Sequence, residues 1–179
     1  MFYAAGSLFL KICHHRLLSL RHNVVMIAVV QRVNKASVIV KDKGYESSIR
    51  HGLCVLLGVE SSDQRSDAIW MANKIANLRV FSDQKSKMNL SVKDTSGEIL
   101  LISQFTLAGN CIKGNRPSFT DAAEPALALP LIEQVENELK QIQKIETKIG
   151  LFGEMMDVEI HNNGPVTLII KSMTKENEH

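Results

Sequence analysis

The sequence predicts an α+β domain in which a curved, barrel-like and mostly antiparallel sheet carries two main helices packed on its outside. Two observations predict this class. Short runs of β-branched and apolar residues follow one another along most of the chain, and only two stretches place apolar residues at the spacing of an amphipathic helix. Adjacent strands interrupted by two helices are typical of α+β packing.

The first strands are expected close to residue 26. Ile27 to Val33 and Ala36 to Val40 are rich in β-branched residues, Lys43-Gly44 is a turn signal, and Tyr45 to Ile49 can return as a partner strand. Leu53 to Val59 is apolar on both faces. We therefore expect it to be a central strand that is covered on both sides.

Two helices are expected. Asp63 is placed to cap the first, which runs through Asn77 with one apolar stripe. The second is expected from about Ala126 to Lys144, and Pro125 and Pro130 limit where it can begin.

The remaining strands are expected between and after the helices. The predicted segments are Leu78 to Phe81, Glu98 to Phe105 after a turn at residues 94–97, and Asp157 to Ile160 and Val166 to Lys171 on either side of a turn at residues 161–165. These segments complete the predicted sheet.

Length and composition fit one domain. The chain has 179 residues, of which 45% are hydrophobic and 22% charged, so one core is expected and folding requires neither disulfide nor metal. We expect the domain to span residues 26–173, followed by a polar tail at 174–179. The three cysteines are far apart and form no CxxC pair or Cys/His cluster, which favours a reducing, cytoplasmic compartment and predicts no metal site. Cys54, inside an apolar run, is expected in the core.

Residues 1–25 differ in composition from the rest of the chain. They contain three basic residues and no acidic residue, because all 19 acidic residues lie at or after Asp42. Two explanations remain open for this N-terminal extension: an upstream start codon, with Met26 as the functional start, or an organelle transit peptide. The segment is too short for a membrane span, so no membrane partner is expected.

The charge distribution bears on possible nucleic-acid binding. Residues 26–179 hold 18 basic and 19 acidic residues, a net charge of −1. No broad positive field therefore attracts RNA, and any contact with it must be local.

Common catalytic motifs are missing from the sequence. It contains no GxSxG, HExxH, Walker or GxGxxG pattern, and none of its six histidines is spaced to form a hydrolytic triad. We expect His51 to be a turn residue and His161 a strand-end residue.

Three other segments carry polar groups suited to a site. Ser103-Gln104-Phe105-Thr106-Leu107 ends an apolar strand in polar groups, as ligand-binding strand ends do, or is a plain strand end. Asn162-Asn163-Gly164-Pro165-Val166-Thr167 is an ordinary turn or a place where backbone approaches a ligand closely. The segment from Lys113 through Arg116 to Phe119 can hold phosphate and stack a base, or is a solvated loop.

Together these segments resemble the D-aminoacyl-tRNA deacylase family over residues 26 to about 173. The two family motifs, SQFTL and NxGPVT, appear at residues 103–107 and 162–167. Supporting matches are Gln31-Arg32-Val33, the segment from Lys87 through Met88 and Asn89 to Val92, and Arg116-Pro117-Ser118-Phe119. Five motifs in register are specific, and the resemblance implies a deacylase-like fold without a cofactor.

The resemblance implies a homodimer acting on the 3′ end of aminoacylated tRNA. In such a dimer Gly164-Pro165 would be cis and would enter the partner's pocket, where its carbonyl oxygens would exclude an L side chain. A D side chain or glycine would be accepted. Arg32 would support this turn by hydrogen bonds to its carbonyl groups.

For the chemistry, the resemblance places the catalytic segment at Ser103, Gln104, Phe105 and Thr106. Backbone N–H groups of Phe105 and Thr106 are the candidate oxyanion hole. Two mechanisms remain open: Thr106 as nucleophile, although no motif places a base beside it, and assistance by the terminal 2′-OH of the tRNA, which the family view favours. Lys113, Arg116 and Phe119, with Met88 and Asn89, are the expected substrate and tRNA contacts.

Two other classes of protein compete with this hypothesis. A non-catalytic RNA-binding module would carry basic patches interleaved with aromatics, and this chain has nine aromatic residues without such interleaving. A small-molecule esterase would carry a Ser-His-acid set, which is missing. The sequence therefore favours a carboxylic ester hydrolase acting on D-aminoacyl-tRNA.

Overall fold

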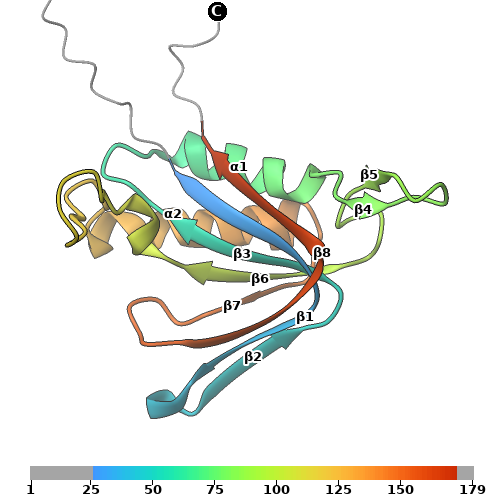
Figure 1. Cartoon of the computed structure of the whole chain (residues 1–179), viewed down its shortest axis with the longest axis horizontal. Coiled ribbons are helices and arrows are strands. Elements are labelled where there is room, and N and C mark those ends of the chain that lie inside the picture. Colours follow the sequence, from blue (N-terminus) through green and yellow to red (C-terminus); the bar gives the residue numbers. More distant parts are fainter. Residues whose placement is uncertain (1–25, 173–179) are drawn as a thin grey trace, which may run out of the picture.

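The computed structural model describes residues 26–172 as one curved sheet with two helices against one of its faces (Figure 1). The N-terminal extension and the polar tail lie outside the described residues. In chain order the elements are β1 (Ile27–Val40), η1 (Lys41–Lys43), β2 (Tyr45–Ile49), β3 (Gly52–Gly58), α1 (Arg65–Asn77), β4 (Phe81–Ser82), β5 (Met88–Leu90), β6 (Glu98–Ser103), η2 (Phe105–Ala108), α2 (Pro125–Asn137), η3 (Glu138–Ile142), β7 (Thr147–Ile149) and β8 (Asp157–Lys171).

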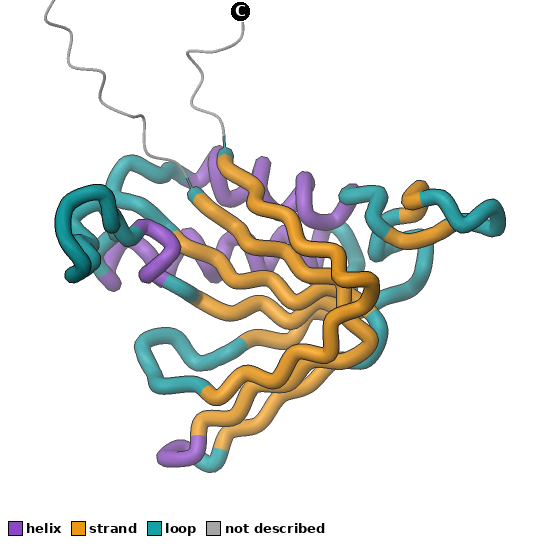
Figure 2. The backbone as a smooth tube through the Cα atoms, viewed as in Figure 1, coloured by secondary structure: helices purple, strands orange, loops and turns teal. Residues whose placement is uncertain are grey.

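The long strand β1 organises the sheet. One of its edges pairs with β8 along nearly its whole length, and the other pairs first with β3 and then with β2, all antiparallel. β6 lies parallel to β3, and β7 lies parallel to β6. The Tyr45 hydroxyl on β2 donates to the carbonyl oxygen of Ile149 on β7 at 2.7 Å, which links the two ends of the sheet. The predicted α+β class with a barrel-like sheet is therefore confirmed (Figure 2).

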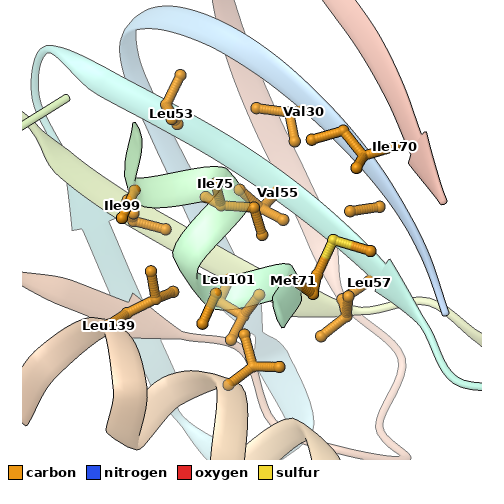
Figure 3. Packing of buried hydrophobic residues seen from close by; sticks show 14 of the residues in the cluster. Val30, Leu53, Val55, Leu57, Met71, Ile75, Ile99, Leu101, Leu139 and Ile170 are labelled. Carbon is orange, nitrogen blue, oxygen red and sulfur yellow. The ribbon is translucent and has the colours of Figure 1, made fainter. Parts of the chain in front are cut away.

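Buried side chains form two clusters on opposite faces of the central strands. Leu53 and Leu57 of β3 pack with Met71 of α1 between sheet and helices (Figure 3). Cys54 of the same strand points to the other face and packs with Val38 inside the curved sheet. The prediction that β3 is covered on both faces is confirmed, as is the core position of Cys54. Burial raises the pKa of the Cys54 thiol to about 12, so this thiol stays protonated.

The two strands predicted at the end of the domain form a single continuous strand in the structure. β8 is continuous over 15 residues, so the turn expected at residues 161–165 is wrong, and His161 lies inside a strand instead of at its end. Gln31 of β1 pairs with Thr167, and Val33 pairs with Asn162, so Arg32 alone faces residues 163–166. These four residues form a bulge, and antiparallel pairing resumes on both sides of it. The two strands expected at residues 27–40 are likewise the single strand β1.

Asp63 does not cap α1. The N-cap is Gln64, whose side chain forms a reciprocal capping box with Asp67. The Asp63 carboxylate instead accepts hydrogen bonds from the backbone N–H groups of Met26 and Glu60, both at 2.7 Å. It satisfies two buried donors, a task that competes with capping.

The second helix and the short strands also differ from expectation. α2 begins at Pro125, where a proline costs no hydrogen bond, and a π-helical segment carries the helix on to Ile142. Residues 78–81 do not form the predicted strand, and only Phe81–Ser82 pair as a strand. Val80 and Phe81 are apolar because their side chains are buried in the core, not because the segment is extended in a sheet. The three-residue strands β5 and β7 were not predicted.

Candidate active site

A cavity of about 590 Å³ opens where β6 ends. Its wall is mostly apolar and comes from the ends of β3 and β6, from α2, and from the segment before β8. The lining residues are Leu57, Val59, Ile102, Ser103, Gln104, Phe105, Thr106, Ala123, Pro125, Ala128, Ile132, Phe152, Gly153, Glu154, Met155, Met156 and Val158. All four residues predicted to be catalytic, Ser103 to Thr106, line this cavity.

The end of β6 leaves backbone donors free at the cavity. The Gln104 N–H still pairs with the carbonyl oxygen of Leu57 at 2.8 Å, after which the chain turns into η2. The first turn of a helix has no internal partners for its N–H groups, and those of Phe105 and Thr106 donate to no other atom within residues 26–172. Gly58 permits this turn, because a Cβ there would lie 2.9 Å from the Cβ of Leu107.

The Thr106 hydroxyl is held by a donor and not by a base. The side-chain amide of Gln104 donates to the Thr106 hydroxyl oxygen at 2.6 Å, and an amide cannot take up a proton from it. Among the described residues that line the cavity, Glu154 has the one ionisable carboxyl, and it pairs with Lys43 at 3.4 Å. The arrangement offers backbone donors without an activated protein nucleophile.

The predicted basic loop lies beside this segment. The rings of Phe105 and Phe119 meet edge to face, with centroids 5.2 Å apart. Asn110 and Ser118 exchange two backbone hydrogen bonds, of 2.8 and 3.0 Å, which close the base of the loop. Lys113, inside the loop, is exposed, as is Arg116. The structure therefore brings Lys113, Arg116 and Phe119 to the same end of the sheet as the cavity.

Gly164 and Pro165 lie exposed in the β8 bulge, joined by a cis peptide bond as the resemblance implied. Arg32 donates through its Nε to the carbonyl oxygen of Asn163 at 3.1 Å and through its Nη1 to that of Val80. Gly164 has a φ of +127°, and a Cβ on it would lie 3.0 Å from the Nη2 of Arg32. A larger residue would therefore be strained and crowded there.

Met88 and Asn89 belong with the bulge and not with the basic loop. They lie on β5 of the small β4–β5 hairpin, where Arg79 donates through its Nε to the carbonyl oxygen of Asn89 at 2.8 Å. The Arg32 bond to Val80, next to β4, ties this hairpin to the bulge. Figure 1 shows the hairpin and the segment after β6 at opposite ends of the molecule.

The predicted site residues therefore form two groups within one chain. The bulge lies opposite Arg32, which pairs with Leu53, whereas the cavity is at Leu57. Four residues separate these positions along β3, roughly 13 Å, and three strand spacings separate β8 from β6, about 14 Å. Neither Arg32 nor any bulge residue lines the cavity of its own chain.

Sequence reasoning missed part of the cavity wall. Phe152 to Met156 and the first half of α2 close one side of it. Met155 and Met156, an adjacent pair just before the last strand, were the available signal, because methionines are common on adaptable binding surfaces.

The fold and cavity of residues 26–172 define an α+β protein whose candidate site presents backbone donors at a strand end. The family model described as "D-Tyr-tRNA(Tyr) deacylase" matches residues 29–171. A D-aminoacyl-tRNA deacylase of Geobacillus sp. is 51% identical over 150 residues, covering 84% of this chain and 97% of the relative. One of Cytophaga hutchinsonii is 50% identical over 153 residues, covering 84% of this chain and all of the relative. The chain belongs to the D-Tyr-tRNA(Tyr) deacylase family, a family of hydrolases.

Solved structures agree on the fold. One titled "c-Myc DNA Unwinding Element Binding Protein" is 41% identical, with a TM-score of 0.76 over 83% of this chain and 99% of that one. A probable eukaryotic D-amino acid tRNA deacylase has a TM-score of 0.72 over 83% of this chain and 100% of that one. At 12% identity the second comparison supports the fold alone.

Two features are missing from the part of the chain that the structure describes. Between residues 26 and 172, no helix is long and apolar enough to cross a membrane. The same residues contain no group of three or more His, Cys, Asp or Glu side chains that could hold a metal ion.

Proposed function

We propose that this chain hydrolyses the ester between a D-amino acid, or glycine mischarged on the alanine tRNA, and the 3′ end of a tRNA in the cytoplasm. The observation that carries the proposal is the cavity at the end of β6, where the Phe105 and Thr106 N–H groups are free beside an apolar wall. Such donors stabilise the oxyanion that forms when water attacks an ester. The membership of the chain in the deacylase family supports the substrate class.

The active unit is a homodimer in which the β8 bulge of one subunit enters the cavity of the other. The separation between bulge and cavity supports this, because the two groups of site residues cannot meet within one chain. β8 also supports it, since its described partner is β1 alone and its other edge is open. Ile169 on this strand is 69% exposed, and an apolar, open-edged strand is a surface that another chain can cover.

Backbone atoms of the β8 bulge distinguish D- from L-amino acids in the substrate. Carbonyl oxygens of the bulge occupy the space that an L side chain needs, while a D side chain points to solvent. Arg32 supports this, because its bond to Asn163 fixes the bulge from behind. Since the filter acts by excluding a side chain, glycine passes as well as D-residues.

Hydrolysis is assisted by the terminal 2′-OH of the tRNA, with the protein orienting the ester and excluding the wrong substrate. The absence of a base beside Thr106 among the described residues supports this route over a protein nucleophile. Lys113, Arg116 and Phe119 hold the terminal adenosine and its phosphates next to the cavity.

One assay tests the proposal. Release of amino acid is measured from D-Tyr-tRNA, L-Tyr-tRNA and a simple D-tyrosine ester. We expect rapid release from D-Tyr-tRNA alone. Release from the simple ester at a similar rate would indicate a small-molecule esterase, and no release from any substrate would indicate a non-catalytic RNA-binding module.

A further inference from the structure

The backbone nitrogen of Met26 lies in a buried acidic environment. It donates to Oδ1 of Asp63 at 2.7 Å, while Oδ2 of the same carboxylate accepts from the Glu60 N–H. Met26 is fully buried, and the Asp63 and Glu60 residues are only 5% and 4% exposed. As a backbone amide, the Met26 nitrogen has a single N–H to donate to these two carboxyl groups.

Two buried side-chain oxygens, on residues hydrogen-bonded to Asp63 or to Met26, have no partner of their own. Within the described residues, the buried side-chain atoms without a hydrogen bond are Oε2 of Glu60 and Oγ of Ser172. Glu60 is bonded to Asp63 through its backbone, and the Ser172 N–H donates to the carbonyl oxygen of Met26 at 2.9 Å. One unsatisfied oxygen therefore belongs to a residue bonded to Met26 and the other to a residue bonded to Asp63, and native proteins leave few such atoms unpaired.

We propose that Asp63 and Glu60 form a binding site for the free α-amino group of Met26, so that the functional chain begins at Met26. An α-ammonium group has three N–H donors where an amide has one. It would keep the bond to Asp63 and would have two further donors to offer to the unpaired oxygens of Glu60 and Ser172. It also brings a positive charge to a place where two carboxyl groups are buried together.

The charges around Asp63 and Glu60 favour a cation at the position of the Met26 nitrogen. Asp67 on α1 and Asp121 in the segment before α2 add negative charge near the two carboxyl groups. Among residues 26–172, Lys171 on β8 is the basic group that acts on Glu60. Desolvation, followed by repulsion from Asp63, raises the pKa of Glu60 to about 7. Desolvation likewise raises the pKa of Asp63 to about 6. A buried carboxylate without a cation is costly, and an ammonium group at the position of this nitrogen would offset part of that cost.

The site matters for the cavity as well as for stability. The segment that follows Asp121 lines the cavity at Ala123, and the Ala123 N–H donates to the carbonyl oxygen of Val59 at 3.0 Å. Glu60 itself pairs with Ala122 as an isolated bridge. The amino-terminus site therefore anchors one wall of the cavity to the start of β1.

The test compares three proteins: the full chain, a chain released by a protease so that Met26 is its first residue, and the same chain with one glycine before Met26. Residues 26–172 contain both buried clusters, and the Cytophaga hutchinsonii relative is matched over its whole length, so we expect the shorter chain to fold on its own. We expect the Met26 chain to unfold about 4 °C or more above the other two at pH 7. Equal unfolding temperatures would overturn the proposal.

Three further measurements distinguish an amino-terminus site from a general change in stability. In ¹⁵N-methionine-labelled Met26 chain, the α-amino pKa is expected at least about one unit above its ordinary value near 7.7–8.0, and an ordinary value contradicts the proposal. Asp63→Asn should abolish the stability difference between the Met26 and glycine-extended chains, whereas Asp42→Asn, at an exposed residue of η1, should preserve it. N-terminal sequencing of the native protein should give Met26, and a start well before it would refute the assignment. Each of these outcomes is independent of tRNA deacylation, so a failure here leaves the proposed function testable on its own.

Discussion

Arg32 on β1 and Asn163 on β8 are 131 residues apart in sequence and are joined by a 3.1 Å hydrogen bond from Nε to the carbonyl oxygen. A second nitrogen of the same guanidinium bonds the carbonyl oxygen of Val80. One planar group thus connects the Gly164–Pro165 bulge to the segment that leads into the β4–β5 hairpin. Lysine cannot replace it, because a single ammonium lacks the fixed fork of the guanidinium.

Arg32→Ala should relax the handedness of the reaction. Loss of both bonds leaves two carbonyl groups without partners and costs about 1–3 kcal/mol each where they are buried, so the bulge gains freedom to move aside. We expect measurable hydrolysis of L-Tyr-tRNA, with D-Tyr-tRNA hydrolysis reduced less than tenfold, roughly 1.4 kcal/mol. Single-turnover rates on both substrates measure the ratio of L-Tyr-tRNA to D-Tyr-tRNA hydrolysis.

Arg79→Ala is the matched control for Arg32→Ala, because Arg79 bonds a neighbouring backbone oxygen, that of Asn89, without touching the bulge. Full rejection of L-Tyr-tRNA by Arg32→Ala would show that Arg32 does not support a filter.

Gly164→Ala should destabilise the fold more than the same change at another glycine of positive φ. The new Cβ would lie 3.0 Å from Arg32 Nη2 and 3.0 Å from Cγ2 of Val166, in a conformation that costs an L-residue about 1–3 kcal/mol. Gly114→Ala is the control, since Gly114 has a φ of +72° and nothing within 4 Å of the added Cβ. Denaturant unfolding of both variants measures the difference. Equal losses would mean that crowding by Arg32 and Val166 contributes nothing.

The central strands could be predicted from local pattern. A β-branched run indicated β1, a run apolar on both faces indicated β3, and the apolar segment ending in Ser103-Gln104 indicated a strand end with polar groups at a site. Both patterns are local, because alternation and strand termination are properties of neighbouring residues. The structure places that strand end at the cavity.

The path of β8 could not be predicted in this way. Gly164-Pro165 is a strong turn signal, and a strand that continues past it depends on β1, whose Gln31 and Val33 pair on either side of the bulge. The same holds for β7, where three residues pair because β6 lies beside them. The role of Asp63 was also non-local, since one of its two donors, Met26, lies 37 residues away.

Thr106→Ala should leave most of the activity. The Thr106 hydroxyl accepts a bond from Gln104, and no base lies beside it in the part of the chain that the structure describes. Its removal is therefore expected to lower kcat by less than about tenfold, whereas loss of a general acid or base typically costs 10²–10⁴-fold. D-Tyr-tRNA ending in 2′-deoxyadenosine should instead react at least about 100-fold more slowly with the unaltered enzyme. If Thr106→Ala is inactive and the tRNA that ends in 2′-deoxyadenosine still reacts, Thr106 is the nucleophile.

Ile169→Glu should dissociate the proposed dimer. Ile169 is 69% exposed on the open-edged strand that carries the bulge, and a buried, unpaired carboxylate at an interface is strongly unfavourable. Sedimentation velocity should show a monomer, and D-Tyr-tRNA hydrolysis should fall with it because each cavity loses the partner's bulge. Ile142→Glu is the control, as Ile142 is 65% exposed on the helix layer instead. A dimer that survives Ile169→Glu would place the interface elsewhere.

Glu60 should make the stability of the full chain depend on pH. The pKa of its carboxyl is raised from 4.5 to about 7 by desolvation and then by Asp63, so the folded protein binds a proton that the unfolded chain has released. Because the folded state then holds more protons, the free energy of unfolding must fall as pH rises from about 4.5 to about 7, and it levels off above that window. Glu60→Gln keeps the shape of the side chain without its charge and should reduce this fall, leaving the part that comes from Asp63, whose pKa is raised from 3.8 to about 6. Glu46→Gln, at an exposed position on β2, should not change the fall. Urea unfolding at pH 4.5, 6 and 8 measures this change in the free energy of unfolding, because these pH values span the window between the ordinary pKa of Glu60, 4.5, and its raised pKa of about 7. In the chain that begins at Met26 the fall should be smaller than in the full chain, because the α-ammonium group holds the carboxylates ionised in the folded state and so brings their pKa values back toward those of the unfolded chain.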